Sequence, residues 1–233
     1  MSRKIRGIVF DLEGTIVSVE ECHTGGFSAA ALSYGIEITP QELLEIPGYV
    51  GAGDKRAIDM ILEKFRRADV DAEEFRIRKM ERYNELLNVA DIALRPGFAD
   101  FCCQASRHWL QIAIASLTPR VQANPLIKRI GLEQLVPIER IVLREDVTNV
   151  KPNPEVFLEA AARINVHPRS VLVFGDSVHD MTAAVAAGSV PIGMPCNFRD
   201  PFIGDLLKAG AVDVFKDWRS IRLEGLLKIV QGL

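Results

Sequence analysis

Two acidic side chains stand close together where the first apolar run of the chain ends. Residues 8–15 read Ile-Val-Phe-Asp-Leu-Glu-Gly-Thr, so Asp11 follows the apolar residues directly and Glu13 comes two residues later. Carboxylates in such positions can act as nucleophiles, as general acids or bases, or as ligands of a hard cation. Taken alone, the pattern fits a strand that ends in an acidic turn equally well.

Three later segments carry polar groups of complementary chemistry. Ser116 ends a second apolar run, Lys151 precedes an expected helix start, and a third apolar run ends in Gly-Asp at Asp176, with Asp180 four residues farther on. The carboxyl ends of parallel strands meet at one edge of a sheet, so we expect these groups to lie together. Each also has a simpler interpretation: a strand-end cap for Ser116, a solvated lysine, and acidic capping of a helix start.

The elements that must position these residues follow an alternating order. Helical patterns separate most of the apolar runs, which favours a doubly wound parallel sheet. Six strands are expected, at residues 5–10, 111–115, 140–143, 171–174, 190–193 and 212–215.

In their order along the chain, these groups resemble the four motifs of the haloacid dehalogenase superfamily. The resemblance covers nearly the whole chain, and four motifs in order are far more specific than any one of them. It implies an α/β fold, with a Rossmann-like parallel sheet core and an inserted α-helical cap domain. It also implies hydrolysis of phosphoric monoesters through an aspartyl-phosphate.

The resemblance assigns a role to each residue. Asp11 is expected to be the nucleophile, and Glu13 the general acid and then the general base. Ser116 and the backbone amide of Leu117 would hold the phosphoryl group, and Lys151 would neutralise its charge. A carboxylate and a phosphate repel each other, so a divalent cation is needed between them, and Mg²⁺ suits oxygen ligands. The expected metal ligands are Asp11, Glu13 through its backbone carbonyl, Asp176 and Asp180.

Glutamate at position 13 departs from the commonest pattern of the superfamily, which has aspartate there. The extra methylene moves the carboxylate by about a bond length, and displacements near 1 Å can cost on the order of 10²-fold in rate. The enolase-phosphatase branch resembles this chain in having glutamate. The preferred hypothesis is a Mg²⁺-dependent phosphatase of a small phosphorylated metabolite. A non-catalytic binding protein on the same fold is the alternative that Glu13 raises.

A long helical stretch separates the first two expected strands and exceeds an ordinary crossover. We therefore expect a helical cap at residues 16–90 and a core formed by residues 1–15 and 91–233, although the helices could instead add to the core layer. Within the stretch, Thr39-Pro40-Gln41-Glu42 predicts a capping box, Asp54 is a candidate N-cap, and a helix is expected at 71–89.

Three residues of this stretch are candidate substrate ligands. His23 lies twelve residues after Asp11, which resembles the β-phosphoglucomutase branch, where such a histidine links cap closure to the acid/base residue. Lys55 and Arg56 follow a glycine-containing turn and could bind an anionic part of the substrate. A histidine on a helix face and a solvated basic pair are the alternatives. This branch also makes a hexose-phosphate mutase a second candidate activity.

Composition sets limits on the partners. The chain has 233 residues, 48% of them hydrophobic, and a net charge of −3, which is typical of a globular protein without a basic surface for nucleic acid. No apolar stretch approaches the roughly 20 residues that span a membrane. The basic start leads directly into a strand, unlike a signal peptide, so we expect a cytoplasmic protein with reduced cysteines. The oligomeric state stays open.

Overall fold

The computed structural model describes residues 4–49, 52–196, 198–200 and 202–232. The chain divides into two compact units, one formed by Met1–Ser18 with Ala93–Leu233 and the other by Val19–Ile92. The boundaries expected from the sequence, at residues 16 and 90, lie within three residues of these limits. Among the described residues, no helix has the length and apolar character needed to cross a bilayer.

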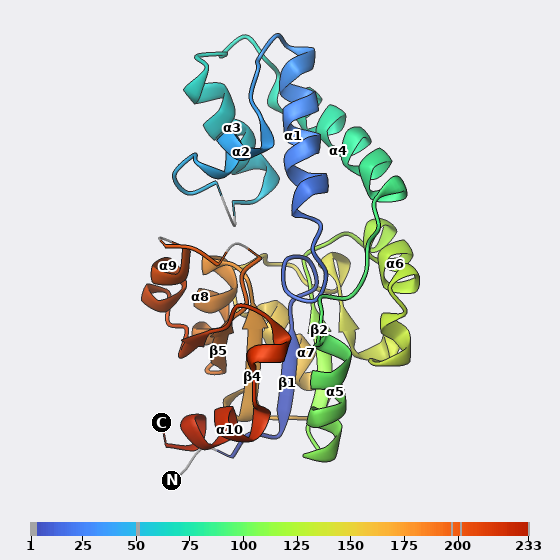
Figure 1. The fold of residues 1–233 in the computed structure, drawn as a ribbon, viewed down its shortest axis with the longest axis vertical. Coiled ribbons are helices and arrows are strands. Elements are labelled where there is room, and N and C mark those ends of the chain that lie inside the picture. The colour runs from blue at the N-terminus through green and yellow to red at the C-terminus, as the bar shows by residue number, and fades with distance from the viewer. Residues whose placement is uncertain (1–3, 50–51, 197, 201, 233) are drawn as a thin grey trace. The chain divides into compact units, whose positions relative to one another are not determined.

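The larger unit is built on a six-stranded, entirely parallel sheet with the order β3-β2-β1-β4-β5-β6 (Figure 1). This confirms the prediction of a parallel α/β sheet, and all six expected strands form. Their bounds are β1 Gly7–Phe10, β2 Gln111–Ala115, β3 Ile141–Val142, β4 Val171–Gly175, β5 Val190–Gly193 and β6 Asp213–Val214.

Strand β1 lies in the middle of the sheet, paired with β2 on one side and β4 on the other. Its four residues are all buried, because helices cover both faces of a parallel sheet. Successive side chains point to opposite faces. Val9 therefore packs in an aliphatic cluster with α7 (Glu155–Arg163) and α8 (Val178–Ala186).

Phe10 points to the other face, where an aromatic cluster fills the core. Its ring lies 5.1 Å from that of Phe98, 5.5 Å from that of Phe174 and 5.3 Å from that of Trp218. Helix α5 (Phe98–Arg107) contributes Phe98 and Phe101 to this layer. Edge-to-face aromatic pairs of this kind each add about 0.5–1.5 kcal/mol to simple burial. The cluster therefore fixes the strand whose next residue is Asp11.

The larger unit contains further α-helices besides α5, α7 and α8. They are α6 Arg120–Arg129, α9 Phe202–Lys208 and α10 Leu223–Gln231.

Helices are the regular secondary structure among the described residues of the smaller unit. It consists of α1 Glu20–Ser33, α2 Pro40–Leu44, α3 Asp54–Lys64 and α4 Ala72–Val89. These helices surround an apolar core of their own that includes Phe27, Ile61 and Phe75. Whether this unit acts as a cap stays a prediction.

Two local predictions in the smaller unit have different outcomes. The capping box forms as expected, since the Thr39 side chain accepts from the backbone of Glu42 and the Glu42 carboxylate accepts from that of Thr39. The prediction that Asp54 is an N-cap was wrong by one position. Gly53 is the N-cap, and the Asp54 carboxylate accepts from the buried ammonium of Lys79 at 2.9 and 3.0 Å.

Candidate active site

Three carboxylates meet at the carboxyl edge of the sheet. Asp11 follows β1, Asp176 follows β4, and Asp180 lies in the first turn of α8. One oxygen of each lies within 4.8 Å of the others. Carboxylate oxygens at this spacing form a donor set suited to a hard divalent cation. The strand ends thus bring together the three side chains that the sequence proposed as metal ligands.

Lys151 joins this cluster from the loop between β3 and α7. Its Nζ lies 2.7 Å from Asp11 Oδ1 and 2.7 Å from Asp180 Oδ1, and it donates to the carbonyl of Ala115 at 3.1 Å. Only 7% of its side chain is exposed. The solvated lysine that the sequence left as an alternative is therefore not what the structure contains.

The pKa values of the buried pair are displaced by the same contacts. Burial raises the pKa of Asp11 to about 7, and the nearby Asp180 and Glu13 carboxylates act in the same direction, although the Lys151 ammonium lowers it. For Lys151, burial alone lowers the pKa, but the two carboxylates outweigh burial and raise it above its ordinary value. Lys151 is therefore charged, while the Asp11 carboxyl takes up a proton readily.

Asp180 also completes the start of its helix. Its Oδ2 accepts from the Ser177 hydroxyl at 2.6 Å and from the Ser177 backbone at 3.1 Å, and Ser177 Oγ accepts from the Asp180 backbone at 3.2 Å. This reciprocal pair is a capping box. The capping interpretation of Asp180 is thus correct for one oxygen, while the other oxygen faces Lys151.

Glycine is required at two positions around the carboxylates. A Cβ on Gly14, whose φ is +80°, would lie 2.2 Å from Asp176 Oδ2. A Cβ on Gly175 would lie 2.4 Å from the Cβ of Asp180. Both backbones therefore approach the acidic side chains more closely than any other residue permits.

The turn that carries Glu13 is held by three donors from distant parts of the larger unit. Arg95 donates from Nη1 to the carbonyls of Gly14 at 2.6 Å and Thr15 at 3.3 Å. Trp218 Nε1 donates to the Thr15 carbonyl at 3.2 Å, and the Cys196 thiol to that of Gly14 at 3.1 Å.

The Arg95 guanidinium joins this turn to two further loops. It also donates to the carbonyls of Met194 at 2.7 Å, Pro195 at 3.2 Å and Lys216 at 3.1 Å. In the sequence, Arg95 is followed by Pro96 and Gly97. An arginine beside Pro-Gly carries no signal that five carbonyls will surround it.

Ser116 follows β2 and is buried, with 2% of its surface exposed. Its Oγ accepts from the backbone of Thr118 at 3.2 Å and lies 2.9 Å from the Thr118 hydroxyl. The half-buried Leu117 stands between them. This hydroxyl pair was not foreseen, because the sequence analysis considered only Ser116 and the amides after it.

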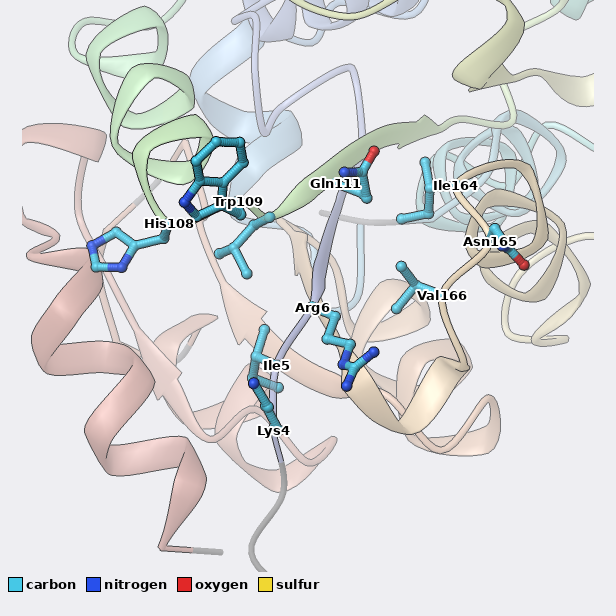
Figure 2. A pocket seen from close by; sticks show the side chains of 10 residues that line it. Lys4, Ile5, Arg6, His108, Trp109, Gln111, Ile164, Asn165 and Val166 are labelled. Carbon is cyan, nitrogen blue, oxygen red and sulfur yellow. The ribbon is translucent and has the colours of Figure 1, made fainter.

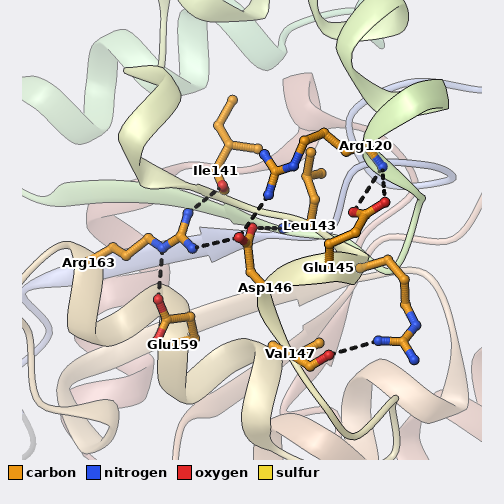
Figure 3. A network of polar contacts seen from close by, with 9 residues as sticks. Arg120, Ile141, Leu143, Glu145, Asp146, Val147, Glu159 and Arg163 are labelled. Atoms are coloured by element: carbon orange, nitrogen blue, oxygen red, sulfur yellow. Dashed lines mark hydrogen bonds and ion pairs between the residues drawn. The ribbon is translucent and has the colours of Figure 1, made fainter.

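A polar network fixes the segment that leads to Lys151. Asp146 accepts from the Leu143 backbone at 2.8 Å and lies between the guanidinium groups of Arg120, at 2.8 Å, and Arg163, at 3.3 Å (Figure 3). Farther along, the Glu155 carboxylate accepts from the backbones of Thr148 and Asn149 at 2.8 Å each. These contacts hold the loop without using Lys151, which leaves its ammonium for the carboxylates.

The other candidate ligands lie in the smaller unit. Lys55 and Arg56 are exposed at the start of α3, whereas His23 is half-buried on α1. His23 Nδ1 lies 3.1 Å from Nζ of Lys79, a fully buried lysine whose ammonium also lies 4.8 Å from the Phe27 ring. The burial of Lys79 was not predicted from the sequence. The part of His23, Lys55 and Arg56 in substrate binding stays a prediction.

Comparison with known families agrees with this geometry. The family description "haloacid dehalogenase-like hydrolase" matches residues 5–188, which is most of the chain. The chain belongs to this family. A phosphorylated carbohydrates phosphatase of Thermotoga maritima is 28% identical over 217 residues, which cover 91% of this chain and 94% of that protein.

Two solved structures extend the comparison. The CbbY protein of Rhodobacter sphaeroides in complex with phosphate has a TM-score of 0.72 at 26% identity, and the match covers 95% of this chain and 99% of that one. A family hydrolase from Entamoeba histolytica has a TM-score of 0.82 at 22% identity, with 97% and 100% covered, and it supports the fold alone.

Proposed function

We propose that this hydrolase is a magnesium-dependent phosphatase of small phosphorylated metabolites and that it works through an aspartyl-phosphate on Asp11. The observation that carries the proposal is the buried cluster in which Asp11, Asp176 and Asp180 lie within 4.8 Å of one another, with Lys151 2.7 Å from Asp11. The similarity to a phosphatase of phosphorylated carbohydrates over 91% of the chain supports the substrate class.

The donor set fits the cation that the family uses. Three carboxylates converge, and burial, together with the nearby Asp180 and Glu13 carboxylates, raises the pKa of Asp11 in spite of the Lys151 ammonium. Asp11, Asp176 and Asp180, with the backbone carbonyl of Glu13, would hold Mg²⁺. When bound, the cation supplies positive charge between the Asp11 carboxylate and the phosphate of the substrate.

In the first half of the reaction, a carboxylate oxygen of Asp11 attacks the phosphorus atom while the ester P–O bond breaks. The leaving alkoxide takes a proton from the Glu13 carboxyl group. Lys151, Ser116 and the amide of Leu117 stabilise the charge on the equatorial oxygens of the phosphoryl group, where most of the transition-state charge resides.

The second half returns the site to its starting state. Glu13, now a carboxylate, takes a proton from a water molecule whose oxygen attacks the phosphorus of the aspartyl-phosphate. The P–O bond to Asp11 breaks, so inorganic phosphate leaves and the Asp11 carboxylate is regenerated.

The first experiment is release of inorganic phosphate from a panel of phosphorylated sugars and short phosphorylated acids, with Mg²⁺ and with a chelator. We expect release that needs Mg²⁺ and that Asp11→Asn abolishes. Release that persists in Asp11→Asn contradicts the aspartyl-phosphate. Isomerisation of a sugar phosphate that a bisphosphate activates, without net phosphate, assigns the mutase activity instead.

A further inference from the structure

A second pocket lies at the opposite edge of the same sheet. It has a volume of about 570 Å³ and is formed where β1 and β2 begin, away from the carboxyl ends that carry Asp11 and Ser116 (Figure 2). Its floor is apolar, made by Ile5, Leu110 and Ile164, each with less than a tenth of its surface exposed. Volumes of this size are typical of small-molecule sites.

The charged groups of this pocket all have one sign. Lys4 and Arg6 line it together with His108, and no carboxylate is among the lining residues. No side-chain hydrogen bond or ion pair of Lys4 or Arg6 occurs within the described part of the chain. Helices α5 and α7 end nearby, and the C-terminus of each carries a partial charge of about −0.5. The two positive charges of Lys4 and Arg6 exceed the sum of these partial charges. The pocket is therefore suited to an anion.

Trp109 gives the pocket a flat aromatic wall. It is 89% exposed and has a φ of +56°, directly after the C-cap of α5, where glycine or asparagine usually stands. A bulky residue in the left-handed region is an outlier that functional sites often retain. Its indole takes no part in the aromatic core that holds the other tryptophan, Trp218. An exposed indole beside cations is a surface on which a planar ring can stack.

Two amide side chains supply the remaining polar contacts. Gln111 begins β2, and Asn165, with a φ of +53°, follows α7 on the other side of the pocket from Trp109 (Figure 2). Carboxamides offer both donors and acceptors, which suits the edge of a nitrogen heterocycle.

We propose that this pocket binds a nucleotide, with the base stacked on Trp109, its edge facing Gln111 or Asn165, and the phosphates on Lys4 and Arg6. The site is separate from the phosphatase cluster, so the inference does not depend on the proposed reaction.

The two tryptophans make a direct binding assay available. The chain has only Trp109, which is 89% exposed, and Trp218, which is 1% exposed. ADP is titrated into the Asp11→Asn protein in the presence of a chelator, which prevents turnover, and the emission of Trp109 reports on this pocket. We expect saturable quenching of the exposed, red-shifted emission, and a matching isotherm by calorimetry.

Variants then test each contact. The double variant Lys4→Gln with Arg6→Gln should weaken ADP binding at least tenfold, and Trp109→Ala should do so by calorimetry. The charge-matched control, Lys128→Gln with Lys208→Gln, removes two exposed cations elsewhere and should leave the affinity unchanged. Circular dichroism checks that each variant is folded.

The outcomes separate the parts of the proposal. Weaker binding of adenosine and of phosphate than of ADP supports a site for both parts of a nucleotide. Inorganic phosphate that binds at this pocket as tightly as ADP overturns it in favour of a simple anion site. Absence of quenching up to millimolar ADP, or equal affinity in the Lys4 and Arg6 double variant, also overturns it.

Discussion

Lys151 lies between two buried carboxylates, so its side chain contributes to the stability of the fold. Its ammonium lies 2.7 Å from oxygens of both Asp11 and Asp180. In an almost fully buried ion pair, the attraction between the charges compensates for the free-energy cost of desolvation only while every partner is present. Lys151 therefore also holds the cluster of carboxylates together, in addition to the role proposed for it in neutralising the phosphoryl group.

Removal of the Lys151 ammonium should destabilise the protein, and bound Mg²⁺ should reverse part of this loss of stability. In Lys151→Ala, two buried carboxylates lose their counter-charge, and we expect the free energy of unfolding to fall by about 3–5 kcal/mol without metal. Urea denaturation with and without Mg²⁺ measures this, and Mg²⁺ should restore part of the loss. Lys208→Ala, which removes an exposed pair with Asp205, is the control and should change stability by less than about 1 kcal/mol.

The raised pKa of Asp11 predicts how stability depends on pH. Its value of about 7 in the fold exceeds the ordinary 3.8, so the folded protein binds the proton more tightly than the unfolded chain. The stability from this group is complete below about pH 4 and is lost as pH rises to about 7. We therefore expect Mg²⁺ to raise the unfolding temperature more at pH 8 than at pH 5. An equal increase at both pH values would contradict this.

Glu13 offers a test of how finely the proposed site is adjusted. If the turn is built for glutamate, Glu13→Asp withdraws the carboxylate by about a bond length and should lower kcat by about 10²-fold. Steady-state kinetics on the best substrate measures the change. A large gain in kcat instead would indicate a site that has lost its usual acid, as in the non-catalytic alternative.

At the scale of elements, the turn after β1 depends on loops far away in the sequence. Arg95 binds the carbonyls of Gly14 and Thr15 and also those of the two loops at residues 194–195 and 216. Through these carbonyls the guanidinium fixes the backbone of the turn that carries Glu13. It is a positioning residue in the proposed reaction.

Substitution of Arg95 should therefore affect turnover more than substrate affinity. We expect Arg95→Ala to lower kcat at least tenfold with a smaller change in KM, because Glu13 is displaced. Guanidinium ion at millimolar concentration should restore part of kcat, which general destabilisation would not allow. Arg67→Ala is the matched control, since Arg67 also donates to a carbonyl, that of Tyr34. Equal kinetic losses in both variants would contradict the positioning role.

The elements themselves could largely be predicted from the sequence, whereas several contacts could not. Apolar runs are local, so all six strands were found. Asp11, Asp176 and Asp180 follow strands in the sequence, so the sheet brought them together as expected. Lys79 was missed because a lysine in a helical pattern is normally assigned to the surface. Its burial depends on Asp54, which lies 25 residues away.

At the scale of the whole molecule, two separate cores predict two levels of protection of backbone amides against hydrogen exchange. β1 is paired on both edges and covered on both faces, whereas α1–α4 surround a core of their own. Hydrogen exchange should therefore show α1–α4 opening together, at lower free energy than β1 and β4. Ile61→Ala should weaken the smaller unit by about 2–5 kcal/mol and speed exchange in α1–α4 alone. Faster exchange in β1 as well would indicate a single cooperative unit.

Asp180 has a consequence for how related sequences are interpreted. One of its oxygens closes the start of α8 through Ser177, and the other faces Lys151. Selection for folding alone would therefore retain this aspartate in a descendant that no longer turned over any substrate. Its presence in a genome-derived sequence is therefore, taken alone, a weak indicator of an active enzyme.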